Sequence, residues 1–271
     1  MQKNFSRMLN ISISALIMSF LLAGARTLLM LLKYDFGTNF YSNDYFPYFI
    51  YVVFALFAVI LYLMCRSLPL TENIRTSKSI ISKILEALTA LIFLIFSMLF
   101  VQKVLVLTDT SSYLDRIAFL ICAPTAFVSG IFFIIKSFCK KNNIVCVMAL
   151  IPSVFFSILL VQGFAGVAKT AASLSYFPDI ISTLILAFYL LNRGKALLLN
   201  NNEIELRKTF TSQCITFISL SFSAIPDTIF FLANRIEGFD IVNILLLFIK
   251  LVFMVYVAVE AISFMKGIKD R

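Results

Sequence analysis

Long apolar runs separated by short polar segments fill almost the whole chain. The runs are about 20 residues long, which is the length a helix needs to cross a bilayer, and they lack the period-two alternation of barrel strands. Inside lipid every backbone polar group must be paired within the protein, and a helix achieves this by itself. The pattern therefore predicts an all-α polytopic membrane protein with eight transmembrane helices. The predicted spans are 11–32, 46–65, 84–106, 117–137, 144–164, 177–191, 209–232 and 239–266.

Composition supports lipid as the surrounding solvent. The chain has 271 residues, of which 61% are hydrophobic and 14% are charged. A soluble domain contains about 45–50% apolar and about 25% charged residues. A water-soluble fold could not bury this much hydrocarbon, so the lipid bilayer is the expected partner of most of the surface. We expect residues 1–271 to form one integral membrane domain.

Lysine and arginine residues are divided unequally between the two sets of loops that eight spans create. One side collects 16 of them, including Lys136 and Arg193, and the other side collects 5. Cytoplasmic loops of membrane proteins carry the excess of Lys and Arg. The asymmetry predicts that both termini are cytoplasmic. It also explains the net charge of +9 without nucleic acid as a partner.

The first run contains Ala23-Gly24-Ala25 after a basic start, which resembles a signal-peptidase site. The apolar run continues past this tripeptide as TLLMLL, so we expect a helix that is not cleaved. The glycosylation sequons at 4–6 and 10–12 fall on the predicted cytoplasmic side, and no external loop carries one. This distribution fits a prokaryotic plasma membrane.

A faint internal repeat relates residues 1–141 to residues 142–271. The tripeptide Tyr-Phe-Pro opens the second span at 45–47 and the sixth at 176–178, an offset of 131, and Phe-Ser recurs at 96–97 and 222–223, an offset of 126. Transporters built from two parallel repeats show such weak symmetry. Short matches also arise by chance in apolar sequence. Two interpretations therefore stay open: a duplication that gives two four-helix repeats, or no duplication.

Three ionisable residues fall in the outer half of the predicted spans: Arg26 in the first, Asp227 in the seventh and Lys250 in the eighth. A lone charge at such a depth costs several kcal/mol, so another polar group must face it. One interpretation is a structural ion pair. The other is a binding site or gate for a small polar or anionic solute, because two cations against one acid leave a positive charge. Pro226 also frees a backbone carbonyl beside Asp227, as in the broken helices that hold transporter ligands.

Glu86 and Glu260 form a secondary polar layer in the inner half of the third and eighth spans. Each lies near a basic residue in the sequence, Lys83 or Lys266. Long cationic side chains reach the membrane interface. We therefore expect local salt bridges at the cytoplasmic ends of these two spans.

Small residues are concentrated where the fifth span ends. Small side chains let membrane helices approach closely, so close packing is one interpretation, and a flexible gate or backbone-lined binding surface is the other. Gln162 adds a polar donor at this end of the helix and joins the candidate binding or gating residues. The small residues are Gly163, Ala165, Gly166, Ala168, Ala171 and Ala172.

No motif indicates catalysis or a cofactor. The chain lacks a Walker A motif, HExxH and GxSxG, and its loops hold no DxxD pair for a metal–pyrophosphate centre. It has no histidine, and its five cysteines form no CxxC pair, so the usual zinc and haem ligands are missing. We expect no catalytic residue, metal or cofactor, and we do not expect an enzyme.

The sequence favours a transporter, or the membrane-embedded subunit of one, for a small polar or anionic solute. Arg26, Asp227, Lys250 and Gln162 would form its binding site or gate. The alternative is a non-catalytic membrane subunit that packs against a partner membrane complex and stabilises or regulates it. Such a partner would be an energising ATPase or another permease chain. In that case the same charges would pair with residues of the partner.

Overall fold

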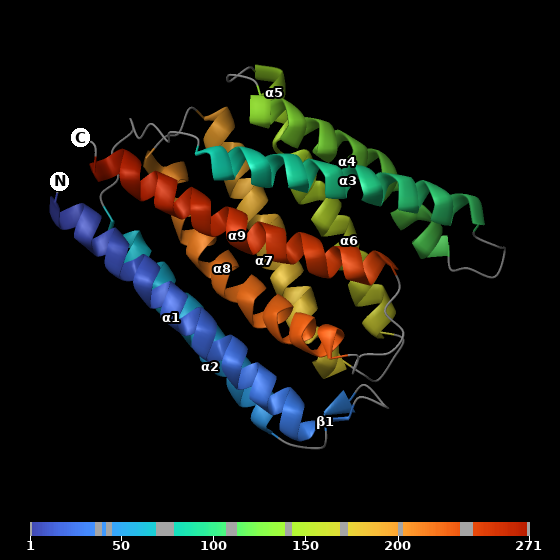
Figure 1. Cartoon of the computed structure of the whole chain (residues 1–271), viewed down its shortest axis with the longest axis horizontal. Helices are drawn as coiled ribbons and strands as arrows, with labels where there is room; N and C mark the ends of the chain where they lie inside the picture. The colour runs from blue at the N-terminus through green and yellow to red at the C-terminus, as the bar shows by residue number, and fades with distance from the viewer. Residues whose placement is uncertain are drawn as a thin grey trace.

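The computed structural model describes residues 2–35, 40–41, 45–68, 79–106, 113–138, 143–168, 173–199, 203–233 and 241–269. Within these residues, eight helices are long and apolar enough to cross a membrane. The chain is therefore an integral membrane protein, and the prediction of an all-α fold with eight spans is confirmed. Figure 1 shows the bundle.

The helices are α1 (Gln2–Lys33), α2 (Phe46–Arg66), α3 (Ile80–Val106), α4 (Tyr113–Phe138), α5 (Asn143–Met148), α6 (Ile151–Ala168), α7 (Ser173–Leu198), α8 (Glu203–Leu232) and α9 (Ile241–Lys269). Two short strands, β1 (Tyr34–Asp35) and β2 (Phe40–Tyr41), pair in antiparallel orientation after α1.

The fifth predicted run is divided into α5 and α6. The break at Ala149 and Leu150 precedes Pro152, which has no backbone N–H and is best tolerated in the first turn of a helix. The Ser153 amide and hydroxyl both donate to the Leu150 carbonyl, at 3.1 and 2.6 Å. Gly194 of α7 packs against the break, where an added Cβ would lie 3.1 Å from the Ala149 carbonyl oxygen.

The polar segment 192–208, which separates the sixth and seventh predicted spans, is expected to be a loop, and this prediction is wrong for the part of it that the structure describes. α7 continues to Leu198 and α8 begins at Glu203. Asn192 and Arg193 both lie within α7. Asn192 is buried, and Arg193 pairs with a carboxylate inside the bundle. Glu203 and Glu205 occupy the first turn of α8, where negative charge is favourable.

The two termini lie at the same end of the bundle, as Figure 1 shows. We call this the near end and the opposite one the far end. α1 and α2 pack together along one side and contact α8. α3 and α4 pack together on the other side, where α3 contacts α9 and α4 contacts α6. α7, α8 and α9 lie between these two pairs, and the possible internal repeat stays a prediction.

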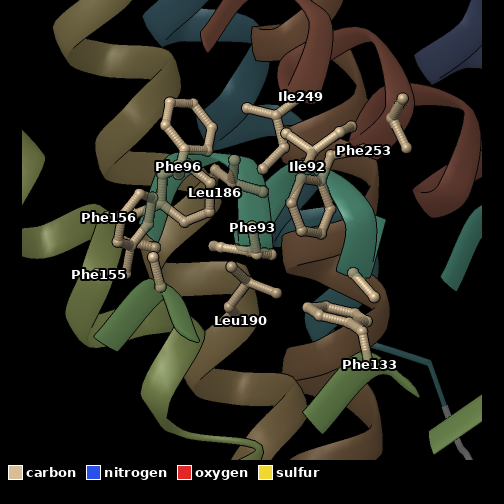
Figure 2. Close-up of a cluster of buried hydrophobic side chains, with 14 of the residues drawn as sticks. Ile92, Phe93, Phe96, Phe133, Phe155, Phe156, Leu186, Leu190, Ile249 and Phe253 are labelled. Atoms are coloured by element: carbon tan, nitrogen blue, oxygen red, sulfur yellow. The ribbon is translucent and has the colours of Figure 1, made fainter. Parts of the chain in front are cut away.

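Two separate apolar cores flank α8. One joins α1, α2 and α8 through residues such as Leu61, Phe210 and Phe222. The other joins α3, α4, α6, α7 and α9 around Phe93, which lies 5.2 Å from Phe155 in an edge-to-face contact between ring centroids. Figure 2 shows this aromatic cluster. Four cysteines are buried free thiols, and Cys139 lies outside the described residues.

Gly163 is not a close-packing position, because an added Cβ would meet no atom within 4 Å. Close packing occurs instead at Gly130 of α4, where an added Cβ would lie 3.0 Å from the Leu94 side chain and 3.2 Å from the Ala90 carbonyl of α3. Nothing is described of the side chains of Ala165, Gly166 and Ala168, and Ala171 and Ala172 lie outside the described residues.

We expect Gly130→Val to destabilise the bundle by about 1–3 kcal/mol, because α3 and α4 must separate to admit the side chain. Equilibrium unfolding in mixed detergent micelles measures this change. The matched control is Gly163→Ala, which meets open space and should be neutral or slightly stabilising. Equal destabilisation by both substitutions would contradict the assigned α3–α4 contact.

Candidate functional site

Arg26 and Asp227 form an ion pair between α1 and α8 at the far half of the bundle. Arg26 Nη2 lies 2.7 Å from Asp227 Oδ1, and Arg26 Nη1 donates to the carbonyls of Phe222 and Ser223, at 2.9 and 2.7 Å. The Phe222 carbonyl is free to accept from Arg26 because the residue four positions later, Pro226, has no N–H to donate to it. Arg26 therefore neutralises Asp227 and also caps a backbone group that Pro226 leaves open.

Lys250 of α9 pairs with Asp179 of α7, a residue that the sequence interpretation missed. The Lys250 Nζ lies 2.6 Å from Asp179 Oδ1, and the Ser223 hydroxyl donates to the same oxygen at 2.7 Å. Because the Ser223 carbonyl accepts from Arg26, Ser223 links the two ion pairs. Asp179 follows Pro178 as Asp227 follows Pro226, and this repeated Pro-Asp dipeptide was the signal that could have identified it.

The far-end cluster is defined as Arg26, Asp179, Ser223, Asp227 and Lys250. Its two cations are buried, with side-chain exposures of 4% for Arg26 and 6% for Lys250. The carboxylates are more open, at 13% for Asp227 and 49% for Asp179. Two cations face two acids, so the positive charge inferred from the sequence is balanced once Asp179 is included. Asp179 is the most exposed of the four charged side chains.

Glu260 of α9 lies at the centre of a second polar cluster, nearer the termini. Its carboxylate accepts hydrogen bonds from the hydroxyls of Tyr189 and Tyr256, at 2.6 and 2.8 Å, and from the Gln213 amide at 3.2 Å. It also pairs with Arg193 of α7 at 3.0 Å. The expected local partner, Lys266, lies where no side chain is described.

Glu86 joins the same cluster from α3. Its Oε1 lies 3.3 Å from the Lys136 Nζ of α4, and Lys136 also contacts Glu260 at 3.7 Å and donates to the Tyr256 hydroxyl. The expected pairing of Glu86 with Lys83 is replaced by this contact, and Lys83 is exposed. The near-end network therefore holds five helices together and contains two cations and two acids. Its members are Glu86, Lys136, Tyr189, Arg193, Gln213, Tyr256 and Glu260.

A polar face of α8 connects the near-end network with the far-end cluster. Residues three and four apart lie on one side of a helix, and this side carries Thr209, Ser212, Thr216, Ser219, Ser223 and Asp227. All but Asp227 are buried. The Thr216 and Ser219 hydroxyls and Gln213 Oε1 have no hydrogen-bond partner among the described residues. Buried hydroxyls without partners are uncommon, since each costs about 1–3 kcal/mol.

The structure brings three of the four predicted binding or gating residues into the far-end cluster. Gln162 is separate: it is partly exposed on α6, and no hydrogen bond joins it to that cluster within the described residues. The described residues also contain no group of three or more Cys, Asp and Glu side chains placed to hold a metal ion. The chemistry available at the far end is charge pairing and hydrogen bonding.

No protein-family model, no curated protein and no solved structure matches this chain.

We expect Glu260→Gln to destabilise the protein by about 3–5 kcal/mol, because it leaves Arg193 and Lys136 as buried cations with too little compensating charge. Equilibrium unfolding in mixed detergent micelles measures the loss. Glu203→Gln is the matched control, since its partner Arg207 is partly exposed and such pairs contribute about 0–1 kcal/mol. A similar small effect for Glu260→Gln would show that the near-end network does not stabilise the bundle.

Proposed function

We propose that this protein is a membrane transporter, or the membrane-embedded subunit of one, that carries a small polar solute and receives it at the far-end cluster. The observation that carries the proposal is the asymmetry of the Asp179–Lys250 pair. The Lys250 side chain is buried, whereas the Asp179 side chain is 49% exposed. An ionic site that pairs a buried cation with an exposed acid, and that adjoins the buried polar face of α8, is suited to receiving a polar solute.

The polar face of α8 supplies a route beyond this site. Structural ion pairs need no polar groups between them, yet Thr216 and Ser219 lie between the two charged clusters with hydroxyls that have no partner among the described residues. Intramembrane polar groups that line a path mark routes for solutes and ions. The near-end network would close the opposite half of the route in this conformation. Glu86 and Glu260 would then act in gating and would not contact a solute at the far end.

The balanced charge of the far-end cluster removes one reason to prefer an anion. With Asp179 included, no cation is left over, so a small polar solute is the class that we retain. Gln162 would take no part in binding at this site, because it is not joined to the cluster in this conformation.

The charge distribution supports an orientation. Lys136 and Arg193 belong to the near-end network and not to loops, which leaves 14 of the 16 basic residues on that side (16 minus 2) against 5 on the other. The near end would therefore be cytoplasmic, with both termini inside and the far-end cluster facing outward. We propose a prokaryotic plasma membrane as the location.

The alternative function is a non-catalytic membrane subunit that stabilises or regulates a partner complex. Under this alternative, Arg26, Asp227 and Lys250 would pair with residues of a second chain. Each of these residues has a partner within this chain, so the charges provide no specific support for the alternative.

Native mass spectrometry after purification in mild detergent separates the two functions. We expect a chain that carries a small polar molecule, and we expect proteoliposomes to take up that molecule once it is identified. A stoichiometric partner protein without a bound molecule would contradict solute binding by this chain and support the alternative.

We expect Lys250→Leu to weaken solute binding by about 10–100-fold, because a hydrogen bond to a charged group contributes about 1.5–3 kcal/mol. The variant should still insert and fold, since the carboxylate that it leaves behind is half-exposed and can be hydrated. Binding is measured by isothermal titration with the identified solute. Lys195→Gln is the matched control, because Lys195 is exposed at the near end of α7, and wild-type affinity in both variants would rule out the assigned site.

A further inference from the structure

We infer that the solute is a dipolar ion, a small molecule that carries one ammonium-type and one acidic charge. The inference deepens the proposed function and rests on it. Its basis is the way in which charge is paired, buried and exposed within the far-end cluster.

The two ion pairs of the cluster differ in how firmly they are held. Arg26 donates to Asp227 and to two backbone carbonyls, so it is fixed at three points. Lys250 has a single hydrogen bond within the described residues, to Asp179. The Asp179–Lys250 pair is therefore the one that a solute can open, whereas the Arg26–Asp227 pair forms a rigid wall beside it.

A solute with one charge can open this pair only by leaving one of its two charges without its partner. A cation that takes Asp179 leaves Lys250 unpaired at 6% exposure. An anion that takes Lys250 leaves the Asp179 carboxylate without its cation and places a second negative charge beside it. Leaving the buried Lys250 without a partner is strongly unfavourable, so a cation is disfavoured. An anion is disfavoured by the repulsion between its negative charge and the Asp179 carboxylate beside it.

A dipolar ion inserts into the pair and preserves every charge contact. Its ammonium group takes the place of Lys250 at Asp179, and its acidic group takes the place of Asp179 at Lys250. The Ser223 hydroxyl, which donates to Asp179 Oδ1 at 2.7 Å, can turn to donate to the acidic group. The exposed side of Asp179 offers the ammonium group a first contact before the pair opens.

The inference is tested by titrating the purified full chain with matched solutes and following the thermal midpoint and the binding isotherm. The dipolar ions are alanine, serine, proline, glycine betaine and taurine. Each is compared with the amine that lacks the acidic group and with the acid that lacks the ammonium group. At least one dipolar ion should bind, with both of its singly charged relatives about tenfold weaker or more.

Two variants examine the mechanism of this selectivity. In Lys250→Leu the amine should bind as tightly as the dipolar ion, because no buried cation remains to be compensated. Ser221→Ala is the control, since the Ser221 hydroxyl is buried on α8 but bonds to the Phe217 carbonyl at 2.7 Å, away from the cluster, and it should keep wild-type selectivity. Should Lys250→Leu not fold, Asp179→Leu with Lys250→Leu removes both charges and should bind neither class.

Several outcomes would overturn the inference: no dipolar ion binds, a singly charged relative binds as tightly as its dipolar parent, or selectivity is unchanged in Lys250→Leu. Other outcomes would contradict the proposed transport function without contradicting the solute class, or the reverse. A dipolar ion that binds the protein but does not enter proteoliposomes contradicts the transport function and leaves the assigned solute class intact. Uptake of a singly charged solute contradicts the solute class and leaves transport intact.

Discussion

Compensation of buried charge is the constraint on which the arrangement of these helices depends. A charged side chain in the membrane interior is tolerated when a group of opposite charge or several hydrogen bonds face it. Arg26 requires α1 to lie against α8, and Lys250 requires α9 to lie within side-chain reach of Asp179 on α7. Glu260 and its partners bind α4, α7 and α9 together nearer the termini. Because each partner comes from a different helix, the ion pairs also fix the register of these helices along the bundle axis.

Apolar packing completes the bundle but does not select its register in the same way. Lipid tails are as apolar as the side chains of the helices, so little hydrophobic force drives membrane helices together. The aromatic cluster around Phe93 instead gains from edge-to-face contacts, such as the one with Phe155 at 5.2 Å. α8 lies between this cluster and the second apolar core, and its polar face carries the hydroxyls that join the two charged clusters. The polar face of α8 therefore lies between the two apolar cores of the protein.

The sequence predicted the spans, because apolar runs of this length are typical of transmembrane helices. It also offered an ion pair between Arg26 and Asp227 as one interpretation, because a charge deep within a span needs a partner. It did not identify Asp179, Lys136 or Arg193 as interior residues. All three lie near the ends of apolar runs, where the pattern alone cannot tell a loop residue from one in an extended helix that turns inward. The structure does not join Gln162 to the charged residues that it describes, and no sequence pattern says which helices α6 will contact. Contacts between distant helices decide these cases, and a single sequence does not contain them.

Pairing of buried charges within one chain is tested most directly by a double-mutant cycle on Lys250 and Asp179. The free energy of unfolding would be measured in mixed detergent micelles for the wild type, Lys250→Leu, Asp179→Leu and the double variant. Residues in direct contact show coupling energies of about 0.5–3 kcal/mol, whereas distant sites add within about 0.3–0.5 kcal/mol. We predict favourable coupling of at least about 1 kcal/mol, because Asp179→Leu leaves the buried Lys250 without its carboxylate. Additive effects would contradict the pairing and, with it, the placement of Lys250 of α9 beside Asp179 of α7.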